Sequence, residues 1–170
     1  MVHPIVKYGQ PVLEQKAAEI KEFDTQELHQ LVDDMFESMY AARGVGLAAP
    51  QIGIAKRIAV IDTSTGEDPD KKLVLINPQI VGTEGTQTGE EGCLSLPTFR
   101  EPVTRAQKVT VRARDAKGNE FEMTGEDLLA RAFLHETDHL NGRLYISHIS
   151  PLKRDLIRRK IRKLQKADEW

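Results

Sequence analysis

Residues 135–139, with the sequence HETDH, constrain this chain more than any other stretch. Residues four positions apart project from nearly the same face of an α-helix, so the imidazoles of His135 and His139 would converge on one point. Glu136 is rotated by about 100° from His135 and flanks that point without having to be a ligand. Two imidazoles and a nearby carboxylate are what metal-assisted hydrolysis requires. The pattern therefore predicts a packed helix that carries part of a metal site.

The single cysteine is the prime candidate for a third metal ligand. Cys93 lies in the segment 91–95 (EGCLS), where Gly92 lets a backbone come close to another group. A thiolate is a strong ligand for a borderline-soft divalent ion, and a Cys/His/His set leaves a fourth position open for water. A structural site would need a fourth protein ligand; His148 and His3 are candidates, and the spacing favours neither. A lone cysteine is, by itself, most often a small buried hydrophobe.

A glycine-rich loop at 44–51 (GVGLAAPQ) is a second candidate for part of a functional site. It lacks the third glycine and the preceding strand of a dinucleotide fingerprint, so phosphate binding is not expected. Its glycines instead let an extended peptide run alongside the backbone. The side-chain amide of Gln51 is a potential donor to a developing oxyanion. Taken alone, however, the loop favours a solvent-exposed glutamine at this position.

Composition excludes several classes of protein. A length of 170 residues suits one domain, and 39% hydrophobic with 29% charged residues argues against a disordered or fibrous chain. The net charge of −2 gives no global signal for nucleic acid, and one cysteine cannot form an internal disulfide. The N-terminus lacks the features of a secretory or transit peptide, and no apolar run approaches the ~20 residues of a membrane span. We therefore expect a cytoplasmic protein without a membrane partner.

Local signals predict three helices around a group of strands. The first helix follows Asp24 as N-cap and ends at Gly44, the second follows Thr124 and ends near 141–142, and the third begins at Ser150 with Pro151. Strands are expected at 57–62, 73–76, 109–114 and 120–123, with a hairpin at 117–119 and an irregular edge strand or turn at 81–89. This order predicts a single α+β domain over 1–170. Its mostly antiparallel sheets would pack around the central metal-binding helix, flanked by an N-terminal and a C-terminal helix.

The C-terminal segment 151–166 is strongly basic. It carries eight cations against the single Asp155, and an apolar stripe recurs at helical spacing; the cations are Lys153, Arg154, Arg158, Arg159, Lys160, Arg162, Lys163 and Lys166. The commoner interpretation is a helix that packs one face on the domain. The sharper hypothesis is a basic helix that docks on an anionic partner such as RNA.

Three separate segments together resemble one family. The segments 44–51 (GVGLAAPQ), 91–95 (EGCLS) and 135–142 (HETDHLNG) look like the three signature motifs of peptide deformylase, in the family's order and at similar separations. The resemblance covers most of the chain, from the glycine loop to the basic terminal helix. Arg131 lies one turn before His135, where bacterial members often have an apolar pocket residue.

The resemblance implies a metal-dependent hydrolase that removes the formyl group from N-formylmethionine on new polypeptides. Carried over by motif position, the metal ligands are Cys93, His135 and His139, and Glu136 is general base and then general acid. The oxyanion would be met by the metal, the Gln51 side chain and the backbone N–H of Leu94. Substrate-binding positions are Val45, Gly46, Gly92 and, near the mouth, Arg100.

The resemblance also implies cofactor and partners. The physiological metal of this family is usually Fe(II), with Zn(II), Ni(II) or Co(II) able to occupy the site. The substrate is the nascent formyl-methionyl polypeptide, and the basic terminal helix is similar to the one that bacterial members use to dock on the ribosome. We expect a monomer with one ion per chain.

Two other functions fit parts of the sequence. The HExxH helix would also permit a metal-dependent endopeptidase. A non-enzymatic metal-binding adaptor that docks on RNA through its basic tail is the alternative from another class.

Overall fold

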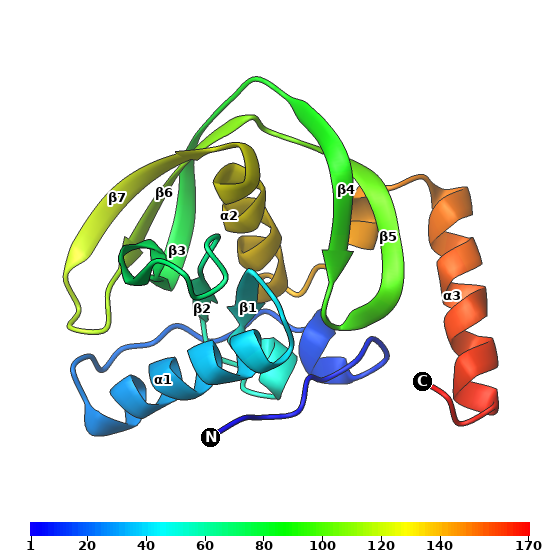
Figure 1. Ribbon diagram of the computed structural model, residues 1–170, viewed down its shortest axis with the longest axis horizontal. Coiled ribbons are helices and arrows are strands. Elements are labelled where there is room, and N and C mark those ends of the chain that lie inside the picture. Colours follow the sequence, from blue (N-terminus) through cyan, green and yellow to red (C-terminus); the bar gives the residue numbers. More distant parts are fainter.

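A computed structural model describes residues 1–170 and contains three α-helices and seven strands (Figure 1). The helices are α1 (Gln26–Ala41), α2 (Asp127–Leu140) and α3 (Pro151–Lys166). The strands are β1 (Gly46–Ala48), β2 (Ile58–Ile61), β3 (Leu73–Glu84), β4 (Gln87–Cys93), β5 (Leu96–Arg105), β6 (Lys108–Arg114) and β7 (Glu120–Glu126). Short 3-10 helices are η1 (Pro11–Glu14), η2 (Ala49–Ile52), η3 (Pro69–Lys71) and η4 (Tyr145–His148).

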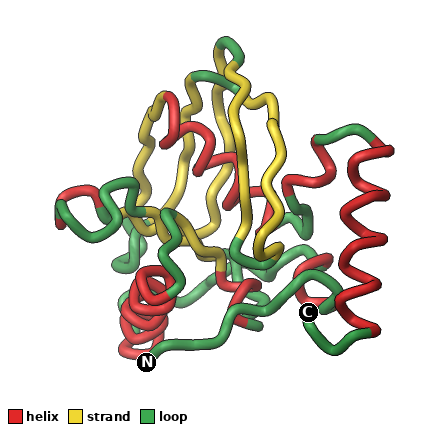
Figure 2. Tube along the Cα trace, turned by 45° about the vertical axis from the view of Figure 1, so that its right-hand side comes forward, coloured by secondary structure: helices red, strands yellow, loops and turns green.

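The strands form two antiparallel sheets. Five strands pair in the order β1-β2-β3-β6-β7, while β4 and β5 form a separate hairpin. Figures 1 and 2 show α2 between the five-stranded sheet and this hairpin. The predicted α+β class with mostly antiparallel sheets, a central helix and helices near both ends is confirmed.

The predicted irregular segment at 81–89 is wrong in one respect. Residues up to Glu84 belong to β3, which lies between β2 and β6 and is not an edge strand. Its irregularity is real, because the β3–β6 register shifts twice, between Ile76 and Gln79 and between Ile80 and Gly82. The turn follows at Gly85, and β4 begins at Gln87.

Helix α2 is fixed by apolar contacts on the sheet. Ala130, Ala132 and Phe133 are buried against residues of β6 such as Val109 and Val111. Strand β7 leads directly into the helix, and a Cβ atom at Gly125 would lie 2.6 Å from the side chain of Leu129. The helix therefore begins against the sheet, and its far end carries the two histidines toward the hairpin.

Two predicted helix starts need correction. Thr25, and not Asp24, is the N-cap of α1, since its hydroxyl accepts a hydrogen bond from the Leu28 backbone N–H. Helix α2 has Glu126 as N-cap without a side-chain hydrogen bond, because Thr124 is still part of β7. The predicted start of α3 is confirmed: Ser150 is the N-cap and accepts from the backbone N–H of Lys153.

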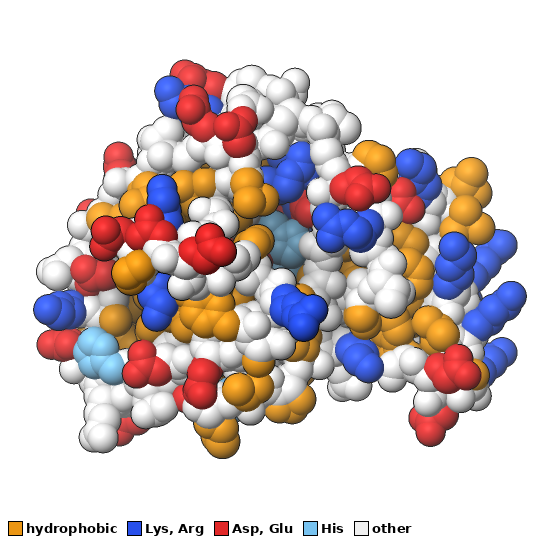
Figure 3. Space-filling view, in the orientation of Figure 1, with side chains coloured by type: hydrophobic (Ala, Val, Ile, Leu, Met, Phe, Trp, Pro, Cys, Tyr) orange, Lys and Arg blue, Asp and Glu red, His pale blue; other side chains and the backbone are white.

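Helix α3 packs one face on the domain and exposes the other. Ile157 and Ile161 are buried among residues of η4 and β5, and the Arg154 side chain donates to the carbonyls of Ile146 and Ile149. Figure 3 shows Lys and Arg side chains gathered over its outer side, at the right of the view. None of the helices of the structure has the length and apolar character that a membrane span requires.

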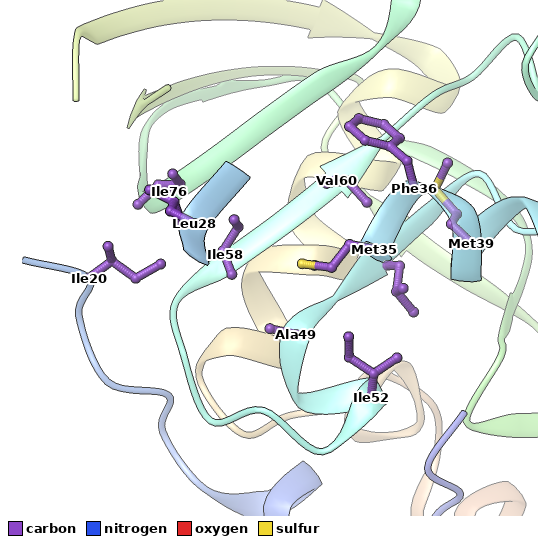
Figure 4. Packing of buried hydrophobic residues seen from close by; sticks show 11 residues of the cluster. Ile20, Leu28, Met35, Phe36, Met39, Ala49, Ile52, Ile58, Val60 and Ile76 are labelled. Carbon is purple, nitrogen blue, oxygen red and sulfur yellow. The ribbon is translucent and has the colours of Figure 1, made fainter. Parts of the chain in front are cut away.

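Helix α1 covers a second part of the core, below the glycine-rich loop. Met35 and Met39 of α1 are fully buried against Ile58 and Val60 of β2, with Ile52 of η2 closing the cluster (Figure 4). Full burial of a side chain of this size stabilises the fold by about 1.5–3 kcal/mol. This packing holds the loop that follows α1, residues 44–51, against the helix with the histidines.

Candidate active site

The structure brings the three predicted metal ligands together. The Nε2 atoms of His135 and His139 on α2 lie 3.1 Å apart, and Sγ of Cys93, at the end of β4, lies 3.3 Å from Nε2 of His139. All three ligand atoms lie within 4.8 Å of one another. His148 and His3 are not part of this group, since they bond to Asp138 and Asp34.

The geometry of the three atoms fits one divalent ion. At ordinary metal–nitrogen and metal–sulfur distances, tetrahedral coordination would separate two ligand nitrogens by about 3.3 Å and a nitrogen and a sulfur by about 3.6 Å. The His135–His139 separation of 3.1 Å and the Cys93–His139 separation of 3.3 Å are close to these values. Burial lowers the pKa of His139 well below its ordinary value, so its ring is in the neutral form that binds metals.

A buried carboxylate orients the first histidine. Oε2 of Glu91 lies 2.7 Å from Nδ1 of His135, which directs Nε2 toward the other two ligand atoms. The Arg105 guanidinium donates two hydrogen bonds, of 3.1 and 2.7 Å, to the Glu91 carboxylate, and Arg131 donates a third of 2.8 Å. Arg105 also donates to Asp138 at 2.8 Å. We call Glu91, Arg105, Arg131 and Asp138 the Glu91 network.

The Glu91 network keeps its carboxylate ionised despite burial. Burial alone would raise the pKa of Glu91, but hydrogen bonds from His135 and Arg105 outweigh it and hold this pKa well below the ordinary value. Arg131, predicted at the site of an apolar pocket residue, is buried here, and its guanidinium also donates to the Val103 carbonyl. Sequence reasoning assigned no role to Glu91 or Arg105. The only available signal was the position of Glu91 inside the cysteine motif.

Glu136 lies beside the ligand group in a buried position. It is 3% exposed, and burial raises its pKa to about 7. Its Oε2 atom has no hydrogen-bond partner. The carboxylate lies against the backbone of Gly46, where a Cβ atom would be 2.9 Å from Oε1. The glycine-rich loop therefore closes over the carboxylate, and only a residue without a side chain fits at this point.

Gln51 is buried, so the prediction of a solvent-exposed glutamine from the loop alone is wrong. Its Oε1 accepts from the Ala48 backbone N–H at 3.0 Å, which fixes the amide orientation. Its Nε2 donates to the Ser95 hydroxyl at 3.2 Å and lies 3.5 Å from Sγ of Cys93. The amide N–H group of Gln51 therefore lies beside the ligand group.

A cavity of about 490 Å³ opens beside these groups. Figure 3 shows it as a hollow at the centre of the view in which a histidine is visible. All of the predicted site residues except His139 line it; they are Val45, Gly46, Gln51, Gly92, Cys93, Leu94, Arg100, His135 and Glu136. His139 is 1% exposed and does not line the cavity.

The fold and the site define an enzyme class: a small α+β hydrolase with a Cys/His/His site compatible with a metal ion. The family model of polypeptide deformylases matches residues 2–155. The chain is 64% identical to a peptide deformylase of Acidobacterium capsulatum over 170 residues, covering 100% of this chain and 99% of the relative. It is 49% identical to one of Thermodesulfovibrio yellowstonii over 158 residues, covering 93% and 95%.

Solved structures agree with the sequence relatives. A crystal structure of a peptide deformylase from Legionella pneumophila superimposes with a TM-score of 0.90 at 45% identity, covering 99% of this chain and 98% of that one. One from Thermus thermophilus gives 0.86 at 39% identity, covering 95% and 94%. The chain belongs to the peptide deformylase family, whose members remove the formyl group from nascent peptides with the help of a metal ion.

Proposed function

We propose that Cys93, His135 and His139 hold one divalent ion, Fe(II) in the cell, and that Glu136 moves the proton in deformylation. The observation that carries this proposal is the convergence of three ligand atoms beside a buried carboxylate. A thiolate and two imidazoles suit Fe(II) as well as Zn(II), Ni(II) or Co(II). Elemental analysis of anaerobically purified protein identifies the ion.

The ion, when bound, supplies a water of lowered pKa and polarises the formyl carbonyl group. The protein supplies preorganised donors for the negative charge that develops on the formyl oxygen: the Nε2–H group of Gln51 and the backbone N–H of Leu94. Gln51 is suited to this role because its amide is already fixed by Ala48 and Ser95. Such donors need no reorientation during the reaction, and loss of one typically reduces turnover by ~10²–10³.

Glu136 accepts a proton from water and delivers it to the departing amine. Its location in a site sealed by Gly46 favours this role, because burial brings the pKa of the carboxylate to about 7 and makes both protonation states accessible. The unpartnered Oε2 atom is free to take that proton.

The substrate strand would lie along Val45, Gly46 and Gly92. The two glycines line the cavity from different strands, β1 and β4, and their lack of side chains favours the approach of an extended backbone. Arg100 lies over Gly92, because a Cβ atom there would be 2.9 Å from Nη1 of Arg100.

Substitution of Glu136 tests the assignment. Glu136→Gln should retain the ion and lose a factor of about 10²–10⁴ in kcat for formate release from formyl-Met-Ala-Ser. Glu122→Gln makes the same chemical change on the exposed side of β7, where Glu122 pairs with Arg112, and should leave kcat unchanged. An active Glu136→Gln variant would refute the general-base role. Internal peptide cleavage without formate release would favour the endopeptidase instead.

We further propose that the enzyme works as a cytoplasmic monomer that docks on the ribosome through α3. The candidate site is complete within one chain, which supports a monomer. Five cations of α3 are exposed and make no ion pair: Arg159, Lys160, Arg162, Lys163 and Lys166. We call these residues the basic face. A concentration of unpaired positive charge on one helix favours a nucleic-acid partner.

A further inference from the structure

The exposed charges at the mouth of the cavity are unbalanced. Three charged residues of its lining are exposed: Arg43, Glu90 and Arg100. Glu90 and Arg100 form a loose ion pair of 3.5 Å, with side chains that are 67% and 61% exposed. Arg43 forms no ion pair. The rim of the cavity therefore carries one uncompensated positive charge.

The charges deeper in the cavity do not alter this balance. Glu91 and Arg131 pair with each other, and Glu136 is buried under Gly46 at the reacting end. The charges of Glu91 and Arg131 therefore compensate each other in part, and the charge of Glu136 lies away from the rim. A peptide that emerges from the cavity therefore first meets the charges of the rim.

The two arginines reach the cavity from different elements. Arg43 follows the end of α1, while Arg100 belongs to β5, and both line the cavity. Arg43 lines the same cavity as Glu136 and is exposed at its rim. An extended substrate advances about 3.3 Å per residue. A peptide whose formyl group lies at Glu136 would therefore hold its formylmethionine inside the cavity and present the second and third residues after it at the rim.

The backbone at Arg43 gives an independent indication. Its φ is 59°, in the left-handed region, directly after the C-cap residue Ala42 of α1. Glycine or asparagine takes this helix-terminating position at the lowest conformational cost. Six other non-glycine residues of the chain also have positive φ, but among the charged residues at the rim Arg43 alone does. Its side chain makes no ion pair that would offset this conformational cost.

We propose that Arg43 selects formyl peptides with acidic side chains at the second and third residues after the formylmethionine; this inference rests on the proposed function. The contact is solvent-exposed and far from the reacting atoms. Its effect is therefore modest, falls mainly on KM, and weakens as salt is added.

The test compares three peptides: formyl-Met-Ala-Glu-Glu, formyl-Met-Ala-Gln-Gln and formyl-Met-Ala-Lys-Lys. For the metal-loaded enzyme at low salt we expect kcat/KM to be about tenfold higher for the Glu peptide than for the Lys peptide. Arg43→Glu should bring this ratio to about one or below, and Arg43→Lys should retain it. Lys117→Glu, which changes the net charge equally at the exposed turn between β6 and β7, should leave the ratio as in the parent enzyme.

The outcomes separate the two proposals. Equal kcat/KM for the Glu and Lys peptides would overturn the selectivity while the proposed function stands. A ratio that survives in Arg43→Glu would overturn the role of Arg43. Absence of formate release from all three peptides would overturn the proposed function and this inference with it.

Discussion

The protein uses its charges in two opposite ways, in the Glu91 network and on the basic face of α3. Glu91 and Arg105 are each 4% exposed, and every charge of the network has a partner of opposite sign within 2.8 Å. The cations of the basic face point to solvent and have no ion-pair partner. One set lies under the candidate metal site, and the other lies on the outside of the last helix.

The difference in burial determines what the Glu91 network and the basic face can each do. Buried pairs are screened little by salt and have one geometry, so the Glu91 network can orient the ring of His135. Exposed cations have no fixed geometry and act through their combined electric field. At 0.1 M salt this field is largely screened beyond about 10 Å. The two regions should therefore respond differently to substitution, salt and pH.

Removal of the central carboxylate should have the largest effect. Glu91→Gln leaves Arg105 and Arg131 buried with one anion fewer, so we expect a loss of about 3–5 kcal/mol in the free energy of unfolding. The His135 ring also loses its anchor, and metal affinity should fall about 10–100-fold. Urea denaturation and metal titration measure both. Glu122→Gln, at an exposed pair, should change the unfolding free energy by less than about 1 kcal/mol.

The effect of Glu91→Gln should depend on pH with a defined sign. The pKa of Glu91 is lowered in the folded protein, so this residue contributes stability above its ordinary pKa of 4.5. That contribution is lost progressively as the pH falls below this value. The stability difference between the parent protein and Glu91→Gln should therefore shrink in acid. A difference that stays constant between pH ~6 and ~3 would contradict the ionised state of Glu91 in the folded protein.

Neutralisation of the basic face should have the second largest effect, and only on binding. Replacement of Arg159, Lys160, Arg162, Lys163 and Lys166 by Gln should weaken ribosome binding by about 10–100-fold at low salt, because fewer phosphate charges are neutralised. Formate release from short peptides and the unfolding free energy should change little, since these side chains are exposed. Co-sedimentation with ribosomes at two salt concentrations measures the binding. Deletion of the helix is a poorer test because it removes the buried Ile157 and Ile161.

Much of the site was predictable because its signals are local. His135 and His139 are brought together by helical spacing alone, whatever the rest of the fold. The chemistry of a borderline-soft ion then pointed to Cys93, the only cysteine. The fold class followed from the order of helices and strands.

The remainder was not predictable because it depends on the packing of distant segments. Glu91 meets Arg105 and Arg131, which are 14 and 40 positions away, only because β5 pairs with β4 and α2 lies against the hairpin. Gln51 is buried for the same kind of reason, through its bond to Ser95, 44 positions away. Residue type favours Asp24 slightly over Thr25 as the cap, and only the backbone geometry, with a φ of 56° at Asp24, gives the position to Thr25.

The smallest effect should come from the residue where the buried network reaches the surface. Nε2 of His148, with a side chain 36% exposed, lies 2.9 Å from Oδ2 of Asp138, the outermost member of the Glu91 network. His148→Gln should cost less than about 1 kcal/mol, because Asp138 keeps its bond to Arg105. His29→Gln on α1, which breaks a more exposed pair with Asp24 outside the Glu91 network, is the control. Metal affinity and formate release should stay within about twofold of the parent values, since a salt bridge at the surface is screened by water. His148→Gln could instead lower the free energy of unfolding as much as Glu91→Gln does. The Glu91 network would then be one cooperative unit that extends to solvent through Asp138 on α2, and its buried and exposed charges would not act separately.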